Sequence, residues 1–250
     1  MLQINKVARI TFLFWLMKII ATTLGETLGD FFSMTLNLGY LTTLIVMLAF
    51  FMIVLVIQLS VKKYIPVFYW LVIIGTTTLG TEISDFMDRT LHLGYTTGSF
   101  ILFIGLIVTL WLWYKKFHAL NVYPIVDKSK EIYFWIAVLF SNSLGTAFGD
   151  FLNDNAGLSY LQGAFITALI IVIVILMHYL FKKMNQVILF WIAFIFTRPF
   201  GATFGDFLTK PVANGGLNLS RLYASLTCML LMAVLILLSH KNQKRAIPLQ

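Results

Sequence analysis

Charged residues are scarce in this chain of 250 residues, since Asp, Glu, Lys and Arg together make up only 11% of it. A soluble domain carries about a quarter, so an ordinary soluble globular protein is excluded. Cysteine is nearly absent, and the single Cys228 lies in an apolar run. A disulfide framework and a cysteine-rich metal site are therefore excluded. The chain also lacks an HExxH motif, a P-loop and any nucleophile–base set, so we do not expect an enzyme.

Apolar residues account for 60% of the chain and form repeated long runs. These runs do not alternate with polar residues, as the strands of a membrane barrel would. They are long enough to cross ~30 Å of hydrocarbon as helices. We therefore predict an all-α polytopic membrane protein, with the lipid bilayer as its surroundings and the first span retained. The eight predicted spans cover about residues 10–32, 40–61, 65–87, 94–114, 132–152, 159–180, 187–208 and 218–239.

The net charge of +8 does not indicate a nucleic-acid partner, because the basic residues lie where membrane topology requires them. Most of them flank the ends of the spans on one side of the predicted bundle. The opposite loops hold only Arg89, Lys210 and Arg221. The positive-inside rule therefore predicts that both termini are cytoplasmic, with residues 241–250 as a basic tail.

A ten-residue motif occurs four times, once in each odd-numbered span, and each copy ends in Asp followed by Phe. A Trp lies fifteen residues before each Asp, and we expect it to mark the inner membrane interface. Each copy opens a two-span repeat, and the four repeats cover residues 10–61, 65–114, 132–180 and 187–239 of one transmembrane domain. An even number of spans makes all repeats parallel, with pseudo-twofold to pseudo-fourfold symmetry about the membrane normal. The Asp residues are Asp30, Asp85, Asp150 and Asp206, and the Trp residues are Trp15, Trp70, Trp135 and Trp191.

Glycines in the motif recur at one register, and in three copies a second Gly follows four residues later. Small residues at this spacing let a neighbouring helix approach closely. We expect this face to pack in every repeat. An alternative is that the Gly-Asp step ends the helix, with Gly as a C-cap and Asp capping the next turn. The motif glycines are Gly25, Gly29, Gly80, Gly145, Gly149, Gly201 and Gly205.

The Asp residues share a helix face with other polar residues of the motif. On insertion scales a charged residue at mid-bilayer costs roughly 2.5–3.5 kcal/mol. Several such residues require compensation by a cation, a proton, a basic partner or local unwinding. The predicted ion- or substrate-binding residues are Asp30, Asp85, Asp150, Asp206, Glu26, Glu82, Thr23, Thr78, Ser143 and Thr146, and the six carboxylates among them are the metal-ligand candidates.

Two basic residues also fall within the spans. Arg198 begins the fourth motif, before Pro199, and we expect it to pair with the Asp set. A permanent structural pair and a gating or charge-balancing role both remain open. Lys18 is expected to extend toward the inner interface. The tyrosines ten residues after an Asp either donate to it across the hairpin or form an aromatic belt; they are Tyr40, Tyr95 and Tyr160.

Four tandem two-span units, each with this Trp and a Gly-rich, Asp-containing motif, resemble a family of bacterial membrane proteins defined by a tandem repeat of unknown function. The resemblance spans about Phe14 to Leu238. It implies the eight-span architecture and a location in the bacterial cytoplasmic (inner) membrane. It implies no substrate.

Three functions remain open. The leading hypothesis is a transporter or channel for a hard cation such as Mn²⁺, Mg²⁺, Ca²⁺ or Na⁺, because oxygen ligands suit these ions. Glu26 and Glu82 are candidates for proton coupling in such a transporter. The alternatives are a proton-coupled carrier of a small organic solute and a non-transporting scaffold or sensor. No organic cofactor is expected beyond a bound metal cation, and a homo-oligomer is compatible with the sequence.

Overall fold

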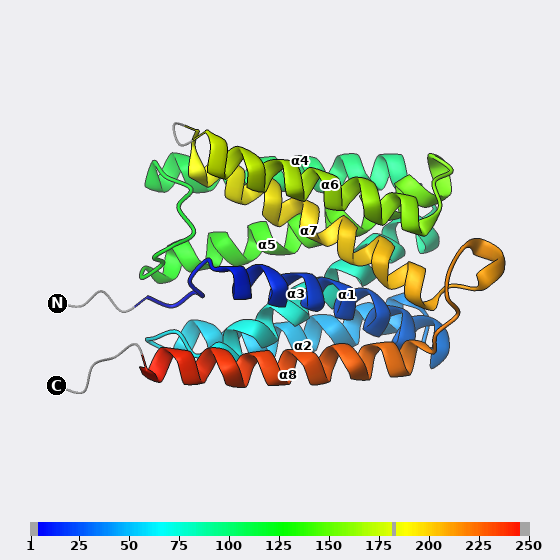
Figure 1. The fold of residues 1–250 in the computed structure, drawn as a ribbon, viewed down its shortest axis with the longest axis horizontal. Helices are drawn as coiled ribbons and strands as arrows, with labels where there is room; N and C mark the ends of the chain where they lie inside the picture. Colours follow the sequence, from blue (N-terminus) through cyan, green and yellow to red (C-terminus); the bar gives the residue numbers. More distant parts are fainter. Residues whose placement is uncertain (1–4, 182–183, 246–250) are drawn as a thin grey trace.

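The computed structural model describes residues 5–181 and 184–245, and within these ranges it contains helices and no strands (Figure 1). Eight helices are long and apolar enough to cross a membrane, which confirms the predicted all-α membrane fold. They are α1 (Phe12–Asp30), α2 (Tyr40–Ser60), α3 (Pro66–Asp85), α4 (Tyr95–Phe117), α5 (Lys128–Asp150), α6 (Tyr160–Leu180), α7 (Gln186–Thr209) and α8 (Arg221–Arg245). Helix α8 thus includes the first half of the predicted tail, while residues 246–250 lie outside the described part.

Several helices begin where the sequence supplies a capping group. The Thr11 side chain accepts a hydrogen bond from the backbone of Phe14 at the start of α1. Asp127 caps α5, and Asn185 caps α7, in the same way. Pro66 is the first residue of α3, where its missing N–H costs nothing. These caps fix the helix starts at the end of the bundle that carries both chain termini, called the terminal end below.

The opposite end, called the motif end, carries the Asp residues. In three repeats the α-helix runs through the Asp into a π-helical turn, namely η1 (Phe31–Thr35), η2 (Phe86–Thr90) and η3 (Phe151–Asn155). The alternative of a Gly C-cap is therefore wrong, and no motif glycine has a left-handed backbone. In the fourth repeat, α7 ends at Thr209 instead. Pro211 has no backbone N–H, and it favours an extended backbone at the preceding residue, Lys210. A short 3-10 turn, η4 (Val212–Asn214), follows.

Each hairpin at the motif end uses the same turn. The residue three positions before the outer helix always has a positive φ, between 53° and 71°. Asn and Gly tolerate this conformation best, and His is also enriched there. The four residues are Asn37, His92, Gly157 and Asn218.

The four motif helices form a closed inner ring in the order α1, α3, α5, α7 and back to α1. Each outer helix packs mainly against the inner helix of the next repeat: α2 on α3, α4 on α5, α6 on α7, and α8 on α1. The last contact closes the circle, and because the number of spans is even, both ends of the chain lie at the same end of the bundle (Figure 1). This ring is the predicted pseudo-fourfold arrangement of parallel repeats.

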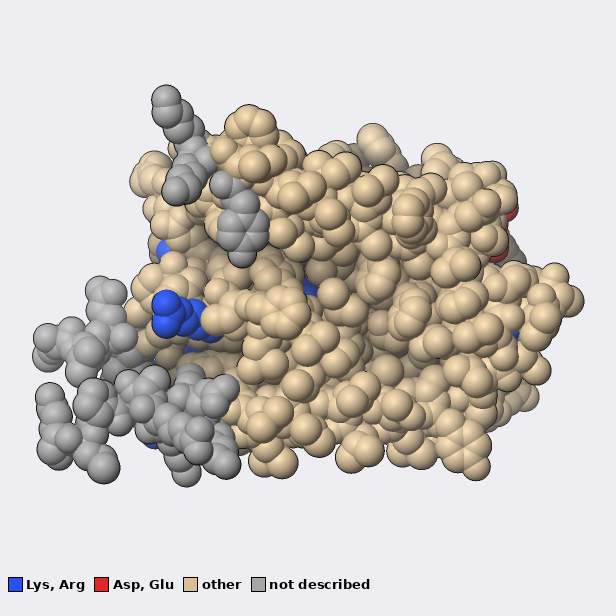
Figure 2. All heavy atoms as spheres, viewed as in Figure 1, with Lys and Arg blue, Asp and Glu red and all other residues tan. Residues whose placement is uncertain are grey.

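Polar residues face the inside of this ring. Between 61% and 72% of the hydrophobic window of each inner helix is buried, against 22–28% for each outer helix. Figure 2 shows one flank of the molecule almost free of charged side chains, as a lipid-facing surface requires. The motif therefore lies on the helices that lipid contacts least.

Motif glycines lie where neighbouring ring helices approach each other most closely. A Cβ added at Gly25 would lie 2.5 Å from the Cβ of Thr77, and one at Gly145 would lie 2.5 Å from the Cβ of Arg198. One added at Gly80 would lie 2.9 Å from the backbone nitrogen of Ser143. Gly201 faces Thr22 in the same way, so the contact recurs at all four junctions of the ring.

Aromatic residues fill the interior toward the terminal end. Trp70 and Trp135 are 1% exposed, and Trp135 lies 5.4 Å from the ring of Tyr69. The Trp191 ring lies 5.8 Å from that of Trp113. Trp70, Trp135 and Trp191 are therefore core residues and do not form a lipid-facing aromatic belt.

The N-terminal segment covers this aromatic core. Val7 is 1% exposed, and the backbone N–H of Lys6 donates to the carbonyl of Ile125 at 2.9 Å. The Lys6 ammonium forms a buried ion pair with Glu131 of α5. The interior is thus closed at the terminal end by both side chains and backbone.

Candidate functional site

The ring brings the four motif Asp residues to the motif end, where they are 1–4% exposed. Basic side chains reach them from neighbouring repeats. The Lys210 ammonium lies 2.8 Å from Asp30 and 3.1 Å from Asp206, and so joins α7 to α1. Arg221, the first residue of α8, lies 3.3 Å from Asp30. We call this group of charges the Lys210 junction.

A second pair of Asp residues lies on the other side of the ring. The Arg89 guanidinium lies 3.1 Å from Asp85 and 3.8 Å from Asp150, and so joins α3 to α5. It also lies over the ring of Tyr40, 5.8 Å from its centroid. We call this group the Arg89 junction. Arg89 and Lys210 each follow the Asp of their own repeat by four residues, which makes the charge pattern twofold rather than fourfold.

One carboxylate cluster has the spacing of a cation site. Oxygens of Glu26, Asp30 and Asp206 all lie within 4.8 Å of one another, and the three residues are buried. We call these three residues the carboxylate cage. The ammonium of Lys210 contacts two of its members.

Arg198 lies deeper in the ring and is fully buried. Its guanidinium donates to Glu26 at 2.9 Å, to the Thr22 carbonyl at 3.1 Å and to the Thr81 hydroxyl. The expected pairing with the Asp set is wrong, since the acidic partner is Glu26. Arg198 therefore holds one carboxylate oxygen of Glu26 from a position deeper in the ring than the cage.

Lys18 is also fully buried, so the expectation that it extends toward the interface is wrong. Its ammonium donates to the Asn142 side-chain oxygen at 2.9 Å and lies 4.1 Å from the centroid of the Phe194 ring. The Asn142 amide in turn donates to Thr76 at 3.0 Å. These contacts link all four inner helices.

Glu82 differs from the other carboxylates. It is fully buried, and neither carboxylate oxygen has a hydrogen-bond partner in the described structure. It lies against Gly29, where an added Cβ would be 2.9 Å from its Oε1. A buried carboxyl group without a donor is far less costly as the neutral acid.

The predicted hydroxyl ligands do not converge on the cage. Each donates to a carbonyl four residues earlier in its own helix: Thr23 to Ile19, Thr78 to Ile74, Ser143 to Leu139 and Thr146 to Asn142. The predicted tyrosines lie near the Asp of the next repeat, as Tyr95 does near Asp150 and Tyr160 near Asp206.

A polar cavity of about 290 Å³ opens among the charges of the motif end. Side chains of both junctions line it, and Asp206 is the cage residue that lies in its wall. Residues that line this outer cavity include Arg89, Asp150, Tyr160, Asp206, Lys210 and Arg221.

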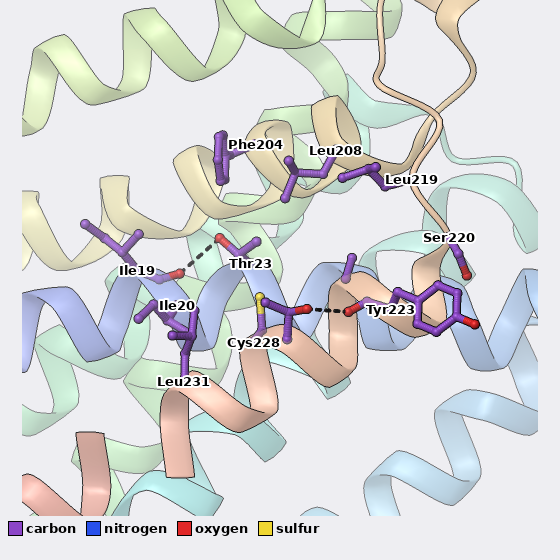
Figure 3. Close-up of a pocket in the computed structure, with 12 residues that line it drawn as sticks. Ile19, Ile20, Thr23, Phe204, Leu208, Leu219, Ser220, Tyr223, Cys228 and Leu231 are labelled. Atoms are coloured by element: carbon purple, nitrogen blue, oxygen red, sulfur yellow. Dashed lines mark hydrogen bonds between the residues drawn. The ribbon is translucent and has the colours of Figure 1, made fainter. Parts of the chain in front are cut away.

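A second hollow, of about 420 Å³, is an apolar groove between α1, α7 and α8 on the flank (Figure 3). Phe204 and Leu208 line it from α7, and Cys228 and Leu231 line it from α8. Thr23 lies at its floor, with its hydroxyl bonded to Ile19 as Figure 3 shows. The groove lacks charged groups and faces the lipid side, so it is separate from the carboxylates.

Lys210 lies just beyond the end of its span. Burial by itself lowers the pKa of the Lys210 ammonium, but Asp206 and Asp30 outweigh it and raise that pKa well above its ordinary value. The side chain is 13% exposed. The group is therefore a permanent positive charge at neutral pH, in contact with both carboxylates and outer cavity.

Sequence reasoning had placed Arg89, Lys210 and Arg221 in loops and missed their contacts with the Asp set. A signal was present for two of them, because residues four apart on a helix are neighbours. Arg89 follows Asp85, and Lys210 follows Asp206, at this spacing. Arg221 gave no such signal, since it reaches Asp30 only through the closure of the ring.

A family profile described as a repeat of unknown function, DUF347, matches four tandem segments of the chain. They cover residues 13–64, 68–117, 133–184 and 189–245, and each contains one inner and one outer helix. No curated protein and no solved structure matches the chain. The resemblance seen in the repeated Trp and Asp residues is confirmed, and the chain belongs to the DUF347 family of tandem membrane repeats.

Proposed function

We propose that the protein transports a hard cation across the bacterial cytoplasmic membrane, and that the carboxylate cage is its binding site. The observation that carries the proposal is the convergence of Glu26, Asp30 and Asp206 from two helices beside a polar cavity. Ionisable residues inside a membrane bundle commonly mark ion or substrate pathways.

The spacing of the cage is compatible with a hard divalent cation. Opposite oxygens lie roughly 4.6–5.2 Å apart in a Ca²⁺ shell and about 4.1 Å apart around Mg²⁺, twice the bond length, and neighbouring oxygens lie closer. The cage oxygens all lie within 4.8 Å of one another. Three carboxylates leave room for further ligands, and water from the outer cavity would complete the shell.

The two ends of the bundle support a carrier more than an open channel. The motif end has a polar cavity, whereas Trp70, Trp135 and the N-terminal segment fill the terminal end. An ion at the cage would thus have access from one side only. Release on the other side would require the aromatic core to open.

We further propose that the terminal end is cytoplasmic. Basic residues that flank the spans concentrate there, including Lys62, Lys63, Lys115 and Lys116. The positive-inside rule favours the cytoplasm for that side. The outer cavity would then face the periplasm.

Flux into liposomes tests this function. Purified wild-type protein should carry at least one ion of a panel of Mn²⁺, Mg²⁺, Ca²⁺ and Na⁺. Asp30→Asn and Asp206→Asn should abolish that flux while the protein stays folded. Asp127→Asn is the matched control, because Asp127 lies at the terminal end and Asn also caps a helix. Either of two results would favour a scaffold. In the first, both cage variants transport as well as wild type; in the second, the wild type transports no ion of the panel and the cage variants fail to fold.

The lining of the outer cavity supports a second candidate, a proton-coupled carrier of a small zwitterionic solute. Arg89, Lys210 and Arg221 line it together with Asp150 and Asp206. Such a mixture suits a solute that carries both charges. A proton flux that depends on an organic solute and needs no metal would distinguish this candidate from the first.

A further inference from the structure

Lys210 places its ammonium group inside the proposed cation site. It lies 2.8 Å from Asp30 and 3.1 Å from Asp206, so a positive charge already bridges two of the three cage residues. The third residue, Glu26, is held by Arg198. A metal ion bound between the same oxygens would be in contact with this ammonium, and like charges at that distance repel strongly. Lys210 and a bound ion therefore exclude each other.

Lys210 has the freedom to leave. Its backbone is anchored, since its N–H donates to the Asp206 carbonyl at 2.8 Å and its own carbonyl accepts from Asn218 at 2.9 Å. Its side chain is a flexible stem with a single compact charge, and it lines the outer cavity. Rotation of the stem alone would move the ammonium from the cage into the cavity.

Arg89, the equivalent residue of the second repeat, is held differently. Its planar guanidinium contacts Asp85 and Asp150 and lies over Tyr40. It belongs to the π-helical turn η2, whereas Lys210 follows the last residue of α7. Among the described residues no third carboxylate clusters with Asp85 and Asp150 at the spacing of the cage, and repeat three has Thr146 where repeat one has Glu26.

We propose that Lys210 is a tethered cation that occupies the cage when no ion is bound and moves into the outer cavity when an ion enters. This rests on the proposed function and adds a residue that sets the affinity of the site. Arg198 pairs with Glu26 and Arg221 with Asp30, but without Lys210 the buried Asp206 of an empty cage would keep no basic partner in the described structure. Lys210 keeps the ion-free protein stable, and it makes each incoming ion compete with an internal one.

Calorimetric titration of the purified protein with Ca²⁺ tests the competition. Lys210→Met removes the charge and keeps the length of the stem, so the variant should bind Ca²⁺ at least tenfold more tightly than wild type. Arg89→Met is the matched control and should change the affinity less than threefold. Equal or weaker binding by a folded Lys210→Met variant would overturn the inference and leave the proposed function intact.

Chemical protection in the wild-type protein keeps the inference testable even if Lys210→Met does not fold. Acetylation of Lys210 by a water-soluble reagent, followed by mass spectrometry, should accelerate at least fivefold at saturating Ca²⁺. The exposed Lys62 should react at the same rate with and without the ion. Unchanged protection of Lys210 in protein saturated with Ca²⁺ would overturn the inference. If neither wild type nor Lys210→Met binds any ion of the panel of Mn²⁺, Mg²⁺, Ca²⁺ and Na⁺, the proposed function fails and the inference fails with it.

Discussion

The Lys210 junction and the Arg89 junction occupy equivalent positions on opposite sides of one ring, yet they differ in charge. Each has two Asp residues bridged by one basic side chain, and Arg221 at the start of α8 adds a second base to Asp30 of the Lys210 junction. The Lys210 junction has in addition Glu26 and Arg198, where the Arg89 junction has Thr146 and Thr77. The extra acid and the extra base pair with each other at 2.9 Å. The two junctions thus differ by an acid and by its paired base, and the Lys210 junction gains Glu26 as a third carboxylate.

This difference indicates how a repeat can specialise inside a membrane. A buried charge alone would be strongly destabilising, but a buried pair costs far less. The Arg89 junction then serves as the structural reference for the Lys210 junction within the same molecule.

The largest effect is expected from Arg198→Met. It leaves Glu26 buried without its partner, and breaking such a pair costs about 3–5 kcal/mol of unfolding free energy. Chemical denaturation in detergent would measure this loss. The double variant Glu26→Thr with Arg198→Thr copies the other junction and should recover most of the stability while losing cation binding. A double variant no more stable than Arg198→Met would show that the pair is not what separates the junctions.

Asp206→Asn should weaken cation binding by roughly a hundredfold, or about 2.7 kcal/mol, because affinity at oxygen sites follows the number of charged ligands. Asp150→Asn makes the same change at the Arg89 junction and should alter the affinity only a few-fold. Titration calorimetry on both variants measures the difference. Equal losses would mean that the two junctions bind ions alike and that Glu26 does not distinguish them.

Gly145→Ala should destabilise the protein by about 1–3 kcal/mol, since overpacking at a tight helix contact forces the backbones apart. The added Cβ would lie 2.5 Å from the Cβ of Arg198. Gly75→Ala is the control, because its Cβ would meet only ordinary contacts at 3.6 Å or more. That variant should gain about 0.5–1 kcal/mol from helix propensity. Thermal unfolding of both would show whether the close approach is needed; a neutral Gly145→Ala would contradict it.

Thr23→Val should have the smallest effect, a loss of about 0.5 kcal/mol, because it replaces one hydroxyl that is bonded within its own helix by a methyl group of the same shape. The hydroxyl of Thr23 bonds to its own helix and lies in the apolar groove. Cation affinity should also stay unchanged. A clear loss of binding would restore Thr23 as a ligand and extend the site toward the groove.

The fold followed from the sequence because its determinants are local. Apolar run length, the even number of spans per repeat and the fixed register of Asp and Gly specify parallel two-helix units. The burial of the Trp residues could not be predicted, because Trp at an interface and Trp in an aromatic core have the same apolar neighbours in sequence. Their burial depends on which helix of the next repeat covers them.

The site was only partly predictable. The carboxylates were visible as charges inside apolar spans, but their partners come from other repeats. Lys210 contacts Asp30, 180 residues earlier, and Arg198 contacts Glu26, 172 residues earlier. Only the closure of α7 and α8 onto α1 brings them together. The ring also makes Glu26 and Glu82 different: Arg198 pairs with Glu26, whereas Glu82 has no hydrogen-bond partner in the part of the chain that the structure describes.

Anomalous X-ray scattering from crystals soaked in Mn²⁺ would test the central claim most directly. The account predicts one strong peak within bonding distance of Glu26, Asp30 and Asp206, with the Lys210 ammonium displaced into the outer cavity. A peak between Asp85 and Asp150 instead, or a cage still filled by Lys210 at saturating Mn²⁺, would contradict it.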